Sequence, residues 1–152
     1  MVKSSRGRRT ETRRATLQAL YQWQITKQLP GDITFPDEWK FPPLDGDYLQ
    51  ELLREIPRCV EQLDIQLNPT LDRPMSQINF VERAILWIGA YELIFRPDIP
   101  WRVAVNEAVE LAKAFGAEQS HKYINGVLDK VAANAGVSST VTDNQNREGP
   151  QE

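Results

Sequence analysis

The segment from 80 to 95 constrains the fold more than any other part of the chain, because its residues are apolar almost throughout. In a helix these residues would cover nearly every side, and such a helix must be surrounded by other elements. We expect it to begin at Ser76 or Asn79 and to end at Phe95, since two prolines follow. The sequence therefore predicts a buried helix at the centre of a bundle.

Four other segments carry apolar residues every three or four positions, as amphipathic helices do. In chain order, the predicted helices run from Arg9 or Thr10 to Lys27, from Asp45–Asp47 to Leu67, from Pro100 at a first helical position to Phe115 with Gly116 as the C′ residue, and from Ser120 to about Ala135. No run alternates as a strand does, and there is no internal repeat. The predicted class is all-α.

Prolines interrupt this pattern in two places. Pro57 lies inside the second stripe, where it removes a backbone donor and crowds the carbonyl of Leu53. We expect a kink or a break there, at a cost of about 3 kcal/mol. The stretch from 30 to 46 is too rich in proline for a long helix. Its large apolar residues predict a loop packed on the body: Ile33, Phe35, Trp39 and Phe41.

Charge is unevenly distributed along the chain. Residues 1–30 carry seven basic side chains and one acidic one, whereas the other 122 residues carry 11 basic and 20 acidic ones, within a total net charge of −3. A basic end on an acidic body indicates a polyanionic partner for that end. We expect residues 1–8 to form a flexible basic arm and the Gly-, Ser- and Asn-rich residues 136–152 to form a disordered tail.

The arginines of the basic end are placed where a helix disfavours them. If the first helix extends back to Arg6, then Arg6, Arg9 and Arg13 share one face. Unsatisfied N–H groups make a helix N-terminus positive, so clustered cations there favour a bound phosphate. The alternative interpretation is a solubilising tail.

Side chains suited to catalysis or metal binding are scarce. A single histidine, His121, and a single cysteine, Cys59, exclude a multi-histidine site, a cysteine cluster and an internal disulfide. Ser120 and His121 are adjacent, so on a helix they point about 100° apart. We expect Cys59 to be an inert buried thiol and His121 to be a capping or surface residue. We therefore expect that the protein is not an enzyme and binds no cofactor or metal.

Neither a secretory signal nor a membrane span is predicted, since no window approaches about 18 uncharged apolar residues. We therefore expect a cytoplasmic protein.

The turn at 116–125 is a second candidate for contact with RNA, because it gathers aromatic and polar side chains at the start of a helix. They are Gln119, His121, Lys122, Tyr123 and Asn125. Taken alone, Tyr123 is more typical of a partly buried core residue.

Five strings of residues, in this order, resemble the NusB family of bacterial transcription antitermination factors. They are Ala-Leu-Tyr-Gln-Trp at 19–23, Val-Glu-Arg-Ala-Ile-Leu at 81–86, Ala-Tyr-Glu-Leu at 90–93, Val-Ala-Val-Asn-Glu-Ala-Val-Glu-Leu-Ala-Lys-Ala-Phe-Gly-Ala-Glu at 103–118, and Ser-His-Lys-Tyr-Ile-Asn-Gly-Val-Leu-Asp-Lys at 120–130. The resemblance covers roughly residues 8–133. The long string at 103–130 is the most specific part.

This resemblance implies a fold and a function. The fold is a single domain at 9–135 made of two packed helical subdomains of the three-helix-bundle type, at about 9–73 and 76–135. The function is binding of single-stranded boxA RNA in ribosomal-RNA transcripts together with NusE, a small-subunit ribosomal protein, and assembly with other Nus factors on RNA polymerase. We expect the stand-alone factor, because the chain carries neither the glycine-rich loop nor the catalytic domain of the related RNA cytosine methyltransferases.

The resemblance also assigns roles to residues. The RNA contacts it implies are Arg8, Arg9 and Arg13, with Arg6 on the same basic entrance, and Lys122 and Tyr123 on the last helix. Tyr21 and Glu82 match positions that face NusE. Asn106 and Glu107 are typical of the family and suit either function or packing. The competing hypothesis is a helical adaptor that binds only proteins and lacks sequence-specific RNA binding.

Overall fold

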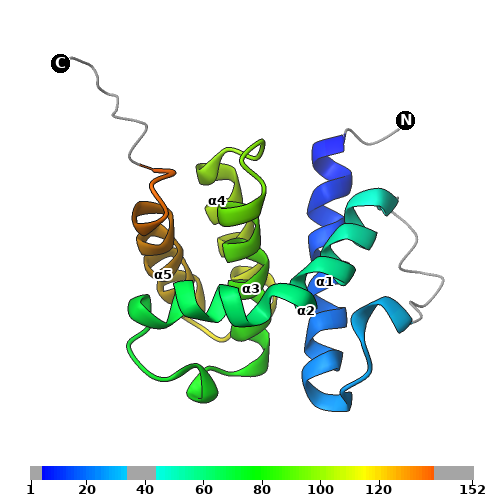
Figure 1. Cartoon of the computed structure of the whole chain (residues 1–152), viewed down its shortest axis with the longest axis horizontal. Coiled ribbons are helices and arrows are strands. Elements are labelled where there is room, and N and C mark those ends of the chain that lie inside the picture. Colours follow the sequence, from blue (N-terminus) through cyan, green and yellow to red (C-terminus); the bar gives the residue numbers. More distant parts are fainter. Residues whose placement is uncertain (1–4, 34–43, 139–152) are drawn as a thin grey trace.

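The computed structural model describes residues 5–33 and 44–138, and within them the chain is helical without any strand (Figure 1). The α-helices are α1 (Ser5–Thr26), α2 (Gly46–Leu67), α3 (Phe80–Phe95), α4 (Trp101–Phe115) and α5 (Ser120–Asn134). Short 3-10 helices occur at η1 (Pro30–Asp32), η3 (Asn68–Thr70) and η4 (Met75–Gln77). The predicted all-α class is confirmed. Among the described residues, no helix is long and apolar enough to cross a membrane.

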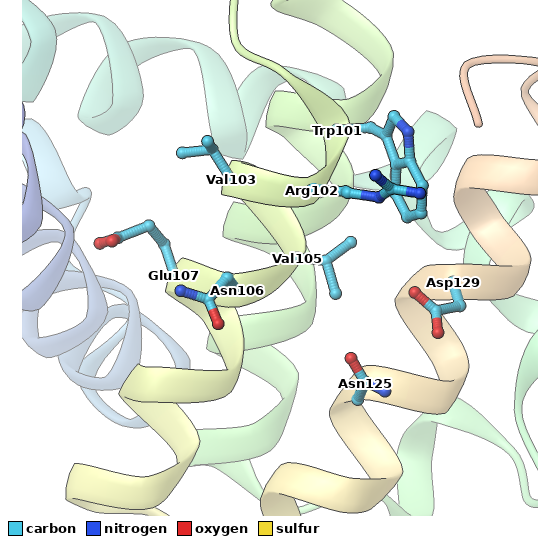
Figure 2. Close-up of a pocket in the computed structure, with 8 residues that line it drawn as sticks. All are labelled: Trp101, Arg102, Val103, Val105, Asn106, Glu107, Asn125 and Asp129. Carbon is cyan, nitrogen blue, oxygen red and sulfur yellow. The ribbon is translucent and has the colours of Figure 1, made fainter. Parts of the chain in front are cut away.

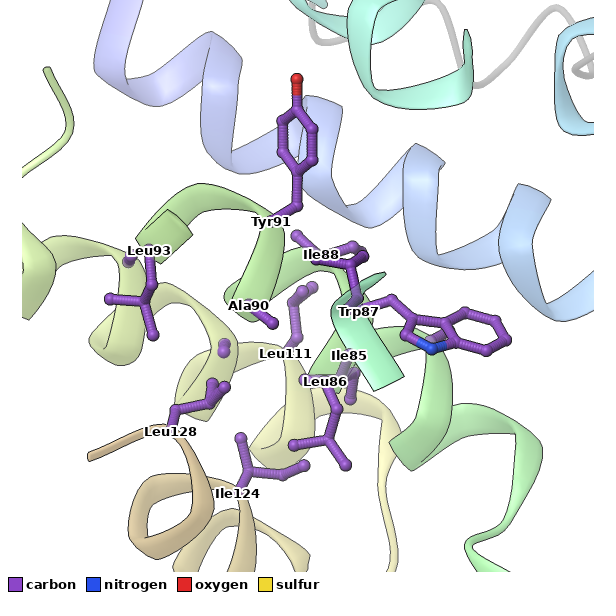
Figure 3. Packing of buried hydrophobic residues seen from close by; sticks show 14 of the residues in the cluster. Ile85, Leu86, Trp87, Ile88, Ala90, Tyr91, Leu93, Leu111, Ile124 and Leu128 are labelled. Carbon is purple, nitrogen blue, oxygen red and sulfur yellow. The ribbon is translucent and has the colours of Figure 1, made fainter. Parts of the chain in front are cut away.

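Helix α3 is the centre of the molecule, as its composition predicts. It packs against α1, α2, α4 and α5 (Figure 1). Figure 3 shows Leu86 of α3 beside Ile124 of α5, and both side chains are fully buried. Burying each such side chain contributes roughly 1.5–3 kcal/mol. The helix starts at Phe80 because the Asn79 side chain caps it, accepting a hydrogen bond of 2.8 Å from the Glu82 N–H.

Helix α2 begins where the sequence predicts and is kinked just after Pro57, as expected for a proline inside a helix. Its N-cap is Asp45, whose carboxylate accepts a hydrogen bond of 3.1 Å from the Tyr48 N–H. The bend is taken up at Cys59, which has φ −113° and ψ 15° while the helix continues on both sides. The missing donor of Pro57 is thus accommodated by one distorted residue just beyond it.

The turns around α4 and α5 differ from the predictions in their details. Pro100 is the residue before α4 rather than its first residue. Gly116 has a φ of −88°, so it is not a left-handed C′ residue. Glycine is needed there because a Cβ would lie 2.8 Å from the Ala112 oxygen and 3.0 Å from the Ser120 Cβ. The left-handed residue is instead Gln119, with φ 76°.

The two ends of the described chain also depart from the predictions. Helix α1 starts at Ser5, so half of the expected flexible arm at 1–8 is helical, and the first four residues lie outside the described residues. At the other end, Gly136 has φ 81° and closes α5 by donating to the Ala133 carbonyl at 3.1 Å. The rest of the expected tail, 139–152, and the aromatic loop residues at 34–43 lie outside the described part of the chain.

Candidate nucleic-acid interface

Arg13 lies inside the protein, which corrects the expectation that it contacts RNA. Its side chain is 3% exposed, its Nε donates to Glu92 Oε2 at 2.8 Å and its Nη1 donates to Glu107 Oε1 at 3.3 Å. The Tyr48 hydroxyl donates to the same oxygen of Glu92. Burial raises the pKa of Tyr48, and Glu92 beside it raises this pKa further, so the phenol stays a neutral donor. Arg13 therefore fixes α1 on α3 and α4.

Arg8 and Arg9 lie on the same helix but closer to solvent. The Arg9 guanidinium is 4.6 Å from the centre of the Tyr48 ring, and its Nε is 3.6 Å from Asp45 Oδ2. The Arg9 side chain is 31% exposed, and Arg8 is also partly exposed. The helix begins early enough for Arg6, Arg9 and Arg13 to share a face, although the Arg6 side chain lies outside the described residues.

Carboxylates of the body offset much of the positive charge on α1. Glu92 and Glu107 neutralise Arg13, Asp45 neutralises Arg9, and the Thr10 hydroxyl donates to Glu107 at 3.0 Å. The arginines of α1 therefore do not all need a phosphate to offset their charge, contrary to the expectation from their position in the helix. Those at the start of α1, which lie closer to solvent, are within reach of an external anion.

The start of α5 carries the second set of predicted contacts. Lys122 is exposed, whereas Tyr123 is half-buried and packs against the hydrophobic core. The Arg73 guanidinium lies 4.9 Å from the centre of the Tyr123 ring. Burial raises the pKa of the Tyr123 hydroxyl. One face of this ring is thus already paired with a cation, so a base could stack only on the opposite face or after displacing Arg73.

The two residues expected to face NusE have different surroundings. Tyr21 is partly exposed and lines a groove of about 350 Å³, with its ring centre 6.4 Å from that of Phe80. Glu82 is only 7% exposed, and its carboxylate accepts a hydrogen bond from the Ser120 hydroxyl. This corrects the expectation for Glu82, whose carboxylate ties the start of α3 to the start of α5.

Two aromatic residues at this groove are not predicted by the sequence pattern. Phe80 is 39% exposed and Phe115 is 49% exposed, and both line the groove with Tyr21. Phe115 falls on the inward stripe that periodicity predicts for α4, but it is the last residue of that helix and the Arg14 guanidinium lies 5.5 Å from its ring centre. Periodicity gives the face of a helix, and it does not tell where neighbouring helices stop covering that face.

A further groove of about 450 Å³ lies between α4 and α5 (Figure 2). Asn106 is exposed in this groove, whereas Glu107 turns toward α1, where it meets Thr10 and Arg13. Of these two family-typical residues, Glu107 has a structural role in helix packing, whereas Asn106 remains available for a functional contact. Asn125 and Asp129 extend into the same space from α5 (Figure 2).

The chemistry of the described residues gives little support to catalysis. Ser120 bonds to Glu82 and not to His121, which is partly exposed. Burial raises the pKa of the Cys59 thiol, which lowers its thiolate fraction and hence its reactivity. No group of three or more His, Cys, Asp and Glu side chains in the described ranges is arranged to hold a metal ion.

Comparison with known proteins decides the family. The model of the NusB family matches residues 10–133. This chain belongs to the NusB family. The transcription antitermination protein NusB of Nitrosococcus oceani is 53% identical over 128 residues, which cover 83% of this chain and 86% of that protein. The protein of the same name from Alcanivorax borkumensis is 49% identical over 131 residues, which cover 85% and 87%.

Solved structures show the same fold. NusB of T. maritima matches with a TM-score of 0.72 and 28% identity, over 88% of this chain and 93% of that one. A structure of antitermination factors NusB and NusE in complex with dsRNA matches with a TM-score of 0.67 and 24% identity, over 82% and 96%. The relatives are named for transcription antitermination. This NusB-family protein is accordingly a transcription antitermination factor rather than an enzyme.

Proposed function

We propose that this NusB-family protein binds single-stranded boxA RNA of ribosomal-RNA transcripts together with NusE. The complex then joins the other Nus factors on RNA polymerase in the cytoplasm, where it suppresses premature termination. The solved complex of NusB and NusE with dsRNA, whose fold this chain shares, supports an assembly of this kind.

The observation that carries the proposal is the cationic start of α1 on an acidic body. Helix α1 is fixed to the body through Arg13, so Arg8 and Arg9 at its outer end are held in place rather than loosely attached. Arginine suits phosphate oxygens because its donors form a planar fork. In this proposal Arg6, Arg8 and Arg9 contact phosphates, and Lys122 and Tyr123 contact the RNA at the start of α5.

The partner surface in this proposal is the groove of Tyr21, Phe80 and Phe115, with Glu82 supporting it from the interior. Exposed aromatic side chains in a groove are typical of protein-binding sites. This groove also favours the second candidate function, a purely protein-binding adaptor. Titration of boxA and scrambled RNA, with and without NusE, separates the two, because equal binding of both RNAs in the presence of NusE would support the adaptor.

Salt dependence tests the basic surface directly. If about four phosphates are contacted, log K should fall with log salt at a slope near −3, since each contact on a single strand contributes about −0.7. We expect the double variant Arg8→Ala and Arg9→Ala to flatten this slope by about 1.4, because it removes two contacts. Binding is measured by fluorescence anisotropy across a range of salt concentrations.

The matched control changes the same charge elsewhere. Arg54 and Arg58 lie exposed on α2, with side chains that are 58% and 70% exposed and paired with Glu55. Replacing both by alanine should leave the slope unchanged. A slope that stays the same in the Arg8 and Arg9 variant, or falls equally in the control, would remove the start of α1 from the RNA interface.

A further inference from the structure

The groove between α4 and α5 lies between the two proposed RNA contacts. On one side it is lined by Glu107, which bonds to Thr10 next to Arg9 on α1. On the other side it is lined by Asn125, one helical turn after Lys122 on α5. Residues close to both proposed contacts thus line one groove, and Figure 2 shows Glu107 on α4 and Asn125 on α5.

The lining of the groove suits the edge of a nucleobase. Asn106 and Asn125 are exposed, and no hydrogen bond occupies either side chain among the described residues. Each amide offers both a donor and an acceptor. The Asp129 carboxylate has no cationic partner in the described part of the chain, although it lies in a groove on a protein with many basic side chains. Free acceptors of this kind are available to a ligand.

The groove also has a planar cation and a volume that suit a base. The Arg102 guanidinium lies 5.1 Å from the centre of the Trp101 ring, and both residues line the groove. Guanidinium and aromatic planes are the surfaces on which proteins stack splayed bases. A volume of about 450 Å³ falls within the range of roughly 300–1,000 Å³ typical of small-molecule sites.

We propose that the α4–α5 groove is a nucleobase site for a base that carries an exocyclic amino group. In this inference, which rests on the proposed RNA binding, one base of the bound strand enters the groove. Its amino group donates to Asp129, and Asn106 and Asn125 bond to the rest of its edge. Adenine, cytosine and guanine carry the required amino group and uracil does not.

The charges around the groove favour RNA over a basic peptide. Arg102 lines the groove, and Lys122 and Lys130 are exposed on the same helix as Asp129. A strongly basic peptide would meet these cations, whereas an RNA strand places its phosphates beside them. In this inference Asp129 reads the base while the cations hold the backbone, since phosphate contacts position a strand and base contacts specify it.

Base preference provides the test. The probes are fluorescent oligo(C) and oligo(U) of equal length, titrated against the full chain at one fixed salt concentration. We expect the wild-type protein to bind oligo(C) about tenfold more tightly, which corresponds to about 1.4 kcal/mol. In Asp129→Asn this ratio should fall, because the neutral amide is a weaker acceptor than the carboxylate and has one accepting oxygen instead of two. Asn125→Ala should lower the ratio as well.

A control of equal charge distinguishes base reading from simple electrostatics. Glu61→Gln changes the same charge on the exposed surface of α2. It should leave the ratio of the two affinities unchanged, even if both affinities rise slightly. Circular dichroism of each variant shows whether it is folded. If Asp129→Asn does not fold, Asn125→Ala tests the same groove independently.

The possible outcomes separate this inference from the proposed function. If the wild-type protein binds neither RNA, the proposed RNA binding itself is wrong. If it binds both with a ratio near one, or if Asp129→Asn leaves the ratio unchanged, RNA binding stands and the base site is wrong. A loss of NusE affinity in Asp129→Asn with an unchanged base ratio would make the groove a protein site and overturn the inference.

Discussion

Helices α1 and α5 both pack on α3, but different interactions hold them there. Helix α1 is joined through the buried ion pair of Arg13 and Glu92, and through the Gln24 side-chain amide, which donates to the Phe80 carbonyl at 2.8 Å. Helix α5 is joined mainly by apolar side chains, and Leu128 fits directly against Gly89 of α3.

The two kinds of contact do different work: polar contacts fix the orientation of a helix, whereas apolar contacts mainly hold it against its neighbour. Apolar burial is non-directional, so most of the contact that holds α5 does not depend on hydrogen-bond geometry, and the hydrogen bond from Ser120 to Glu82 at its start is the exception. The ion pair on α1 is directional, and a shift of α1 would leave Arg13 and Glu92 buried without partners. The helix that carries the proposed phosphate contacts is thus the one whose orientation is fixed by polar geometry. Each of the following variants tests one side of this comparison.

The largest effect is expected from Glu92→Gln. The variant keeps the volume of the side chain but removes the charge that pairs with buried Arg13, and breaking such a pair from one side costs about 3–5 kcal/mol. Urea denaturation followed by circular dichroism measures the loss. Glu110→Gln is the control, because Glu110 pairs with Lys113 at 3.4 Å on the surface, where a pair contributes less than about 1 kcal/mol. Similar losses in both variants would contradict the buried role of Glu92.

A smaller loss is expected from Gly89→Ala on the apolar side. A Cβ at position 89 would lie 2.5 Å from Leu128 Cδ1, so α3 and α5 must separate slightly or Leu128 must change rotamer, at about 1–3 kcal/mol. Adding Leu128→Ala makes room for this Cβ, so the double variant should lose less than the sum of the two single losses.

Gly126→Ala provides the matched control for this substitution. Gly126 is a helical, exposed residue of α5, and a Cβ added there would meet no atom within 4 Å. Alanine there should stabilise the protein by about 0.4–1 kcal/mol, because it restricts the unfolded chain. The same substitution thus has opposite signs at positions 89 and 126. Equal effects at the two positions would rule out the close contact with Leu128.

The smallest effect concerns a half-buried contact between α2 and α3. The Trp87 indole N–H donates to Asp64 Oδ1 at 2.8 Å, yet burial raises the pKa of Asp64. At pH values below about 3.9, the ordinary Asp pKa, the Asp64 carboxyl is protonated in both the folded and the unfolded state. Its ionisation therefore affects the free energy of unfolding only as pH rises. The wild-type protein then loses stability as the folded state is forced to ionise Asp64.

Asp64→Asn should therefore become more stable relative to wild type as pH rises to neutral. The gain should be about a few tenths of a kcal/mol, since solvent screens a half-buried group. Urea midpoints across this pH range measure it. Asp72→Asn should show the opposite pH trend, because the hydrogen bond from Arg73 lowers the pKa of Asp72. The same trend in both variants would exclude burial as the cause.

The helical framework could be predicted from local sequence because its signals are local. Asn79 and Asp45 precede their helices as caps, and the all-round apolar pattern of α3 has one stable location in a bundle. The bend at Pro57 follows from a missing donor. The position of Cys59 as the distorted residue depends on packing along the whole helix, which no local pattern contains.

The interior position of Arg13 could not be predicted, for a different reason. Its charge favours the surface, but it lies four and seven residues before the buried Leu17 and Leu20, which is the spacing of one helix face. Its partners Glu92 and Glu107 are 79 and 94 residues away in sequence. Recognising the pair requires knowing which helices meet. The sequence signal that remains is a charged residue, Arg13, at a position of the helix that faces the core.

The bend in α2 also sets a fixed distance across the molecule. One half of the helix runs beside α1 and the other reaches toward α5, and Leu52 and Leu67 on either side of the bend belong to one hydrophobic cluster (Figure 1). The kinked helix α2 therefore connects the arginine-bearing end of the molecule to the opposite flank. In the proposed function, a transcript that contacts both flanks would have to span the distance that this helix sets.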